Sequence, residues 1–152
     1  VAQVSRDTAG LFDGVDQLVR SLAMHGHPQG VVSNACGKYA RAVMRANGLG
    51  EVVGEGVGVI KVTFGADDVP RPKPYPDGLL SCCHLLGGDP SLSIYVGDSP
   101  SDGVAARAAG MRSIGVLWGA NERDKLEGFF DVIVSDVLEL RRTLWELLSL
   151  PS

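Results

Sequence analysis

Several common features are missing from this sequence, and their absence narrows the classes of protein to which it can belong. No apolar run approaches the ~20 residues that a membrane-spanning helix needs, and no charged-then-apolar leader opens the chain. No run of basic residues is present, and the net charge is −4, which argues against a nucleic-acid partner. We therefore expect a cytoplasmic protein that binds neither membranes nor nucleic acid.

Cysteine is also scarce, and several catalytic signatures are absent. The three cysteines are Cys36, Cys82 and Cys83, and the adjacent pair does not have the spacing of metal ligands, so reduced thiols are expected. No Gly-x-x-x-x-Gly-Lys run occurs, which excludes a P-loop protein. The absence of a Gly-x-Ser-x-Gly elbow argues against a serine hydrolase of the α/β-hydrolase type.

The remaining composition is that of a globular protein. With 152 residues, of which 45% are hydrophobic and 21% charged, the chain predicts a single domain over residues 1–152. Short β-branched runs alternate with amphipathic segments, which is typical of an α/β fold. We expect a Rossmann-like three-layer sandwich with a mainly parallel sheet. Helices are predicted over residues 13–26, 37–47, 76–86, 100–109 and 136–148, and strands over 30–33, 57–60, 93–96, 112–116 and 131–134.

The most informative segment is 94–102, a predicted strand followed by two acids. Asp98 comes directly after the strand, and Asp102 lies four residues later at the start of a helix. Ligands of open α/β sheets bind at strand ends, and carboxylates suit Mg²⁺. A purely structural interpretation places Ser99 at the N-cap and Pro100 in the first turn, with Asp102 interacting favourably with the helix dipole. It explains Asp102 but not Asp98.

Two other segments carry groups that can bind phosphate. Lys73 lies in the proline-rich run 71–77, where the stiff prolines would pre-set the direction of its side chain, although a lone lysine is usually solvated. Ser33 and Asn34 end another predicted strand. They are either ordinary turn residues or a phosphate cradle near a helix start.

The order and spacing of these three segments resemble the haloacid dehalogenase (HAD) superfamily of phosphohydrolases, and within it the phosphoglycolate phosphatase-like branch. The resemblance runs from about Leu11 to the last helix. It is also carried by residues 48–49, 71–77, 109–111, 115–119 and 131–135.

The resemblance implies a phosphatase of small phosphorylated metabolites that forms an aspartyl-phosphate and uses Mg²⁺. Ser33 would be the phosphate-binding hydroxyl, and Asn34 would lie beside the substrate. Lys73 would hold the nucleophile and phosphoryl oxygens together, which makes Lys73 and Ser33 the candidate catalytic residues. Asp98 would be the direct Mg²⁺ ligand, and Asp102 the outer acid of the metal site.

The family's first motif, an Asp-x-Asp after a hydrophobic strand, is missing. The nearest candidate is the segment 11–16, but Asp13 and Asp16 are three residues apart and fit better at the start of a helix. We therefore expect a C-terminal part of a longer protein, without the nucleophile strand and the cap domain, and inactive alone. The missing strand would lie between the Ser33 strand and the Asp98 strand, supplied by the missing N-terminal segment or by a second copy of the chain.

Four alternatives can be weighed against this interpretation. The chain could be a non-catalytic regulatory or binding remnant, or part of a phosphosugar mutase of the same superfamily. A signalling receiver would use Asp98 as the phosphate acceptor, but the Lys73 and Ser33–Asn34 segments argue against it. A dehalogenase of this superfamily would need no metal, whereas Asp98 and Asp102 match the metal-binding form.

Overall fold

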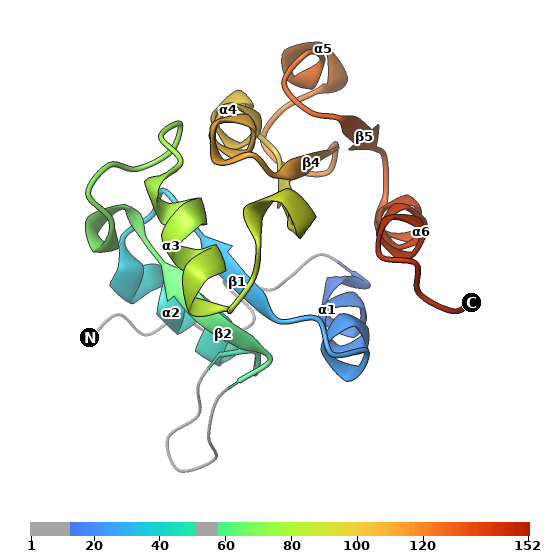
Figure 1. The fold of residues 1–152 in the computed structure, drawn as a ribbon, viewed down its shortest axis with the longest axis horizontal. Coiled ribbons are helices and arrows are strands. Elements are labelled where there is room, and N and C mark those ends of the chain that lie inside the picture. Colours follow the sequence, from blue (N-terminus) through green and yellow to red (C-terminus); the bar gives the residue numbers. More distant parts are fainter. Residues whose placement is uncertain (1–12, 51–57) are drawn as a thin grey trace.

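A computed structural model describes residues 13–50 and 58–152 as alternating strands and helices (Figure 1). The order is α1 (Val15–Met24), β1 (Gln29–Val32), α2 (Gly37–Ala46), β2 (Ile60–Phe64), η1 (Ala66–Asp68), α3 (Asp77–Leu85), η2 (Pro90–Leu92), β3 (Ile94–Gly97), α4 (Pro100–Ala109), β4 (Arg112–Val116), α5 (Arg123–Leu126), β5 (Val132–Val134) and α6 (Val137–Leu147). The predicted α/β class is confirmed.

The strands form two small parallel sheets. β1 pairs with β2 in one sheet, and the other has the order β3-β4-β5. Within the described residues, no ladder joins β1 to β3, although both strands line the same pocket. The sheet is thus divided at the position where the sequence predicts a missing strand.

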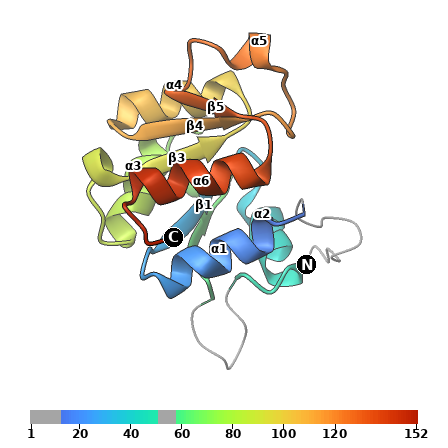
Figure 2. The same ribbon diagram turned by 90° about the vertical axis from the view of Figure 1, so that its right-hand side faces the viewer.

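Helices cover both faces of the strands, which gives the expected three layers. On one face α1 and α6 lie side by side (Figure 2). Their buried residues form one core cluster with β4 and β5: Leu18, Leu22, Ile114, Val116, Val134, Leu140, Leu144 and Trp145. On the other face α3 and α4 pack together through Leu79, Ala105, Ala106 and Ala109.

The ends of α4 are set by local sequence, and its predicted bounds are confirmed. Pro100 occupies the first turn, where its missing N–H costs nothing, and the Asp102 carboxylate accepts a hydrogen bond from the backbone N–H of Ser99. Gly110 ends the helix with a φ of 76°, a conformation that glycine adopts without strain. The site residues at the start of this helix are therefore fixed in position.

One strand differs from the expectation. β2 begins at Ile60 and ends at Phe64, whereas the sequence predicted a strand over 57–60. The position of β2 is decided by its pairing with β1 and by the packing of α2, and not by the apolar run alone. In the observed register, Val31 lies opposite Thr63 and Val32 opposite Phe64. The short helices η1, η2 and α5 were not predicted either, because single turns have no hydrophobic period.

The segment 11–16 does not supply a nucleophile strand in the described part of the chain. Residues 7–12 lie outside the described residues. Asp16 occupies the first turn of α1 and pairs with Arg20 at 2.7 Å, so the interpretation as a helix start is confirmed.

All three cysteines are free, and burial raises the pKa of the Cys82 thiol to about 11. Across residues 13–50 and 58–152, no helix is long and apolar enough to cross a bilayer.

We expect Gly103→Ala in α4 to destabilise the protein, although alanine is the better helix former. A Cβ atom at this position would overlap the backbone of Phe129. Overpacking of this kind costs about 1–3 kcal/mol, more than the ~1 kcal/mol that helix propensity contributes. Urea denaturation measures the difference. Val104→Ala on the exposed face of the same helix is the control, and an unchanged or higher free energy of unfolding in Gly103→Ala would contradict the close contact.

Candidate functional site

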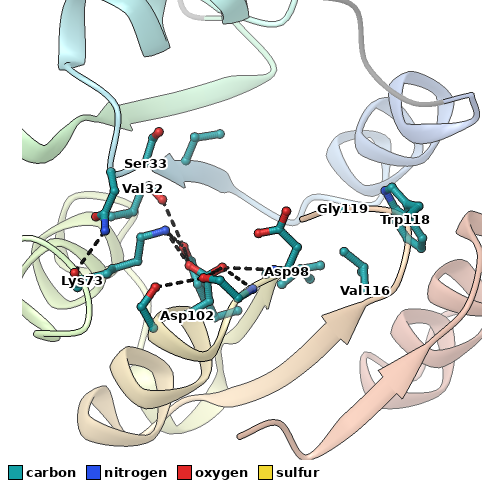
Figure 3. Close-up of a pocket in the computed structure, with 15 residues that line it drawn as sticks. Val32, Ser33, Lys73, Asp98, Asp102, Val116, Trp118 and Gly119 are labelled. Carbon is teal, nitrogen blue, oxygen red and sulfur yellow. Dashed lines mark hydrogen bonds and ion pairs between the residues drawn. The ribbon is translucent and has the colours of Figure 1, made fainter. Parts of the chain in front are cut away.

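All five residues singled out from the sequence line one pocket of about 470 Å³ between β1 and β3 (Figure 3). They come from three separate segments: the end of β1, the loop before α3, and the end of β3 with the start of α4. The other residues of its lining are Val31, Val32, Tyr95, Val96, Gly97, Ser99, Ser101, Val116, Trp118 and Gly119. The predicted convergence of the motifs is therefore present in the fold.

The centre of the site is an ion pair between Lys73 and Asp102. Lys73 Nζ lies 2.6 Å from Asp102 Oδ1, and the two side chains are only 9% and 6% exposed. Lys73 Nζ also donates a hydrogen bond of 2.9 Å to the Tyr95 hydroxyl. The loop that carries Lys73 is held from the other side, because the Asn34 amide donates to the Lys73 carbonyl at 3.1 Å. The peptide bond between Lys73 and Pro74 is cis.

Both carboxylate oxygens of Asp102 are engaged. Oδ1 accepts from Lys73, and Tyr95 lies 3.3 Å from it. Oδ2 accepts from the backbone N–H groups of Asp98 (3.0 Å) and Ser99 (3.2 Å) and from the Ser99 hydroxyl. The structural interpretation made from the sequence, in which Ser99 caps α4 and Asp102 stabilises its first turn, is thus present together with the ion pair. Asp102 therefore offers no free oxygen for direct metal contact, and only an outer place in a metal site suits it.

Asp98 is held differently, by the loop that follows β4. Its Oδ2 atom accepts from the Ala120 N–H at 3.0 Å, and its carbonyl accepts from the Asn121 amide at 2.9 Å. The backbone of Gly119 comes so close that a Cβ atom there would overlap the Asp98 carboxylate. From the sequence, residues 115–119 carried part of the family resemblance but received no role at the site, although their position after a strand end was the available signal.

Ser33 and Asn34 form the wall of the pocket on the β1 side. The Ser33 hydroxyl oxygen accepts from the Ala35 N–H at 3.0 Å, so its proton can still be donated to a ligand. The first N–H of α2, that of Gly37, donates to the Asp67 carboxylate at 2.6 Å. The Gly37 N–H is therefore engaged within the protein, whereas the Ser33 hydroxyl still has a proton to donate.

Tyr95 is a second residue that sequence reasoning missed. Its hydroxyl lies 3.1 Å from the Val32 carbonyl and contacts both members of the ion pair. Burial, and then the negative charge of Asp102, raise the pKa of Tyr95 well above its usual value, so the hydroxyl stays protonated. The available signal was the two-residue period of the strand, which puts Tyr95 and Gly97 on the same face.

The donor set suits a hard cation bound through Asp98. Magnesium prefers carboxylate, phosphate and water oxygens, and Asp98 is a carboxylate that lines the same pocket as the Ser33 hydroxyl and the Lys73 ammonium. The described residues contain no group of three or more His, Cys, Asp or Glu side chains placed to hold a metal ion. Asp98 therefore fits as one ligand of a site whose other oxygens come from water, substrate or another segment.

Comparison with known proteins gives consistent matches. The family model described as "Haloacid dehalogenase-like hydrolase" matches residues 2–116. A phosphoglycolate phosphatase of Xanthomonas campestris pv. campestris is 34% identical over 140 residues, covering 91% of this chain and 58% of the relative. A phosphoglycolate phosphatase of Escherichia coli (strain K12) is 30% identical over 125 residues, covering 82% of this chain and 47% of the relative.

A solved structure shares the fold. The crystal structure of a HAD family hydrolase from Deinococcus radiodurans, with bound phosphate and sodium, aligns with a TM-score of 0.76 and 26% identity. The alignment covers 93% of this chain and 62% of that one. The chain spans about half the length of the curated relatives it matches.

We expect Lys73→Met to lower the free energy of unfolding by about 3 kcal/mol, because it leaves the Asp102 charge buried without its partner. The double variant Lys73→Met with Asp102→Asn should recover part of this loss. Urea denaturation at neutral pH measures both variants.

Arg20→Met is the matched control. It removes the exposed pair with Asp16, whose side chains are 46% and 26% exposed, and should cost less than about 1 kcal/mol. Equal losses in Lys73→Met and Arg20→Met would mean that the Lys73–Asp102 pair is not buried in solution.

Proposed function

Because the chain belongs to the haloacid dehalogenase-like hydrolase family, we propose that it supplies the phosphate- and metal-binding residues of a Mg²⁺-dependent phosphatase of small phosphorylated metabolites. The observation that carries this proposal is the convergence of Ser33, Lys73 and Asp98 on one pocket. A hydroxyl, an ammonium and a carboxylate at strand ends are the groups that a phosphate and its cation need.

Lys73 and Ser33 are the phosphate ligands in this proposal. An ammonium has three N–H donors, and two of those of Lys73 are used by Asp102 and Tyr95, which leaves one for a phosphoryl oxygen. Ser33 can donate its hydroxyl proton to the same ligand from the end of β1, and Asn34 lies beside it. Phosphoryl transfer depends on such positioning and charge neutralisation.

Asp98 is the Mg²⁺ ligand in this proposal. When bound, the ion neutralises negative charge on the phosphoryl group. Asp98 suits this role because the Ala120 N–H engages one carboxylate oxygen and thereby fixes the direction of the other. Asp102 acts from outside, through the backbone N–H of Asp98 and through Lys73.

The nucleophile must then come from a segment beyond the described residues. Asp98 and Asp102 are the carboxylates among the described residues that line the pocket, and both already have roles. The backbone of Val32 faces the pocket, because the neighbouring Ser33 N–H donates to β2 and backbone groups alternate along a strand. On β3 the Ser93 carbonyl accepts from β4, so by the same alternation Val96 faces the pocket. A strand parallel to β1 and β3 would pair with both edges.

Such a strand would bring an aspartate into the pocket at its carboxyl end. Its carboxylate oxygen attacks the phosphorus, the bond from phosphorus to the ester oxygen breaks, and the substrate leaves as an alcohol after a general acid on the same strand protonates it. Water then cleaves the aspartyl-phosphate and releases inorganic phosphate. In this proposal the strand comes from an upstream segment of a longer protein, because a second copy of this chain would have the same sequence, which contains no Asp-x-Asp motif.

In this proposal the substrate class is inferred from the similar proteins. Two similar proteins are phosphoglycolate phosphatases, and the similar D. radiodurans structure holds a phosphate ion. The alternative function is phosphate binding without turnover. In that case the same residues bind phosphate, but even a longer protein would not supply a nucleophile strand.

We expect the 152-residue polypeptide alone to release no phosphate from phosphoglycolate or p-nitrophenyl phosphate with Mg²⁺, because the described pocket offers no free nucleophile. A longer protein that includes the upstream segment should turn over. A colorimetric phosphate assay compares the two. Steady turnover by the short polypeptide would refute the missing-nucleophile argument, and an inactive longer protein would favour the binding remnant.

In the longer protein, Asp98→Asn should lower Mg²⁺-dependent turnover by at least about a hundredfold, because the amide removes a charged oxygen ligand. The same assay over a range of Mg²⁺ concentrations measures the loss. Asp124→Asn on the exposed helix α5 is the control and should keep the normal rate. Unchanged turnover in Asp98→Asn would argue against the metal-ligand role.

A further inference from the structure

Tyr95 touches all three segments that build the site. Its hydroxyl lies 2.9 Å from Lys73 Nζ, 3.3 Å from Asp102 Oδ1 and 3.1 Å from the carbonyl of Val32, the residue before Ser33. These partners are far apart in the sequence and meet where no backbone ladder joins β1 to β3 within the described residues. The hydroxyl therefore bridges the two sheets beneath the pocket.

The chemistry of the partners fixes the direction of the hydrogen bonds. A lysine ammonium can only donate, and a backbone carbonyl can only accept. The Tyr95 hydroxyl between them must accept from Lys73, and its own proton goes to Val32 or to Asp102. With Asp102 and Tyr95 both accepting, two of the three N–H groups of Lys73 are fixed, and this sets the direction of the third.

The ring and the hydroxyl of Tyr95 have separate roles. The ring packs with the cluster of Leu79, Ala105 and Ala106 between α3 and α4. The hydroxyl contributes its contacts to polar groups of the site. A phenylalanine would keep the packing and remove only the hydrogen bonds, so the two roles can be tested apart.

We propose that Tyr95 is a positioning residue that holds the Lys73 ammonium and directs its remaining N–H at the phosphate. This inference rests on the proposed function, because it assigns the target of that N–H. Tyr95 acts through Lys73 and does not itself touch the substrate. Without the hydroxyl, Lys73 keeps one acceptor, Asp102, and its ammonium can rotate about that contact.

The first test uses the lysine ammonium signals of the 152-residue polypeptide in ¹H–¹⁵N NMR. The sequence holds four lysines, and Lys73→Arg identifies the signal of Lys73. An ammonium held by buried hydrogen bonds exchanges its protons slowly and gives a sharp signal. We expect a sharp Lys73 signal in the unaltered protein, and a broadened or lost one in Tyr95→Phe.

Tyr75→Phe is the matched control, because it removes a tyrosine hydroxyl from the loop that carries Lys73. Tyr75 is 49% exposed, and its ring packs against Arg71. This variant should keep the Lys73 signal, and circular dichroism should show the same fold for all three proteins. A sharp Lys73 signal in Tyr95→Phe, or none in the unaltered protein, would overturn the proposal.

The second test titrates each protein with inorganic phosphate and measures the affinity from the backbone amide signals of Ser33 and Asp98, with the Lys73 signal followed in the unaltered protein. Loss of a hydrogen bond to a charged group should weaken phosphate binding by about tenfold in Tyr95→Phe and leave it unchanged in Tyr75→Phe. Equal affinities in the Tyr95→Phe and unaltered proteins would overturn the proposal. A sharp Lys73 signal that ignores phosphate in the unaltered protein would instead refute the phosphate site of the proposed function, and the ammonium signal would still decide whether Tyr95 orders Lys73.

Discussion

The buried contact between Lys73 and Asp102 is the interaction on which the rest of the site depends. Asp102 accepts hydrogen bonds from Lys73, from the Ser99 hydroxyl and from the backbone N–H groups of Asp98 and Ser99, and the Tyr95 hydroxyl lies 3.3 Å from its Oδ1. It therefore joins the loop before α3, the strand β3 and the first turn of α4. A charge this deeply buried needs a partner, so the position of Lys73 follows from the fold around Asp102.

The division of the sheet is the second constraint. Parallel strands normally have both edges paired or covered, and here β1 and β3 both present a backbone edge to the pocket. Side-chain hydrogen bonds connect the segments around this gap. The Tyr95 hydroxyl contacts the Val32 carbonyl, and the Asn34 amide donates to the Lys73 carbonyl. The side chains that line the pocket are thus held together by tertiary contacts, although no ladder joins β1 to β3 within the described residues.

Much of this could be predicted from the sequence, for identifiable reasons. α4 and β4 were predicted with their observed bounds, because proline, glycine and a short β-branched run mark their ends. β2 was placed wrongly, since its register depends on pairing with β1. Asp98 was singled out because a carboxylate directly after a strand has few structural explanations. Lys73 has an ordinary one as a solvated lysine, and only the order and spacing of the three segments in the family resemblance singled it out. Tyr95 and Asn121 were missed, because an aromatic residue in a strand and an amide in a loop are ordinary until the fold brings them to the site.

Gly119 offers a way to sort related sequences. Its backbone lies against the Asp98 carboxylate so closely that any larger residue would push the carboxylate aside. A homologue that retains the aspartate but carries a bulky residue at this position would keep the motif and lose the geometry. In genome surveys, the pair formed by this glycine and the aspartate should therefore be a better marker of this carboxylate geometry than the aspartate alone.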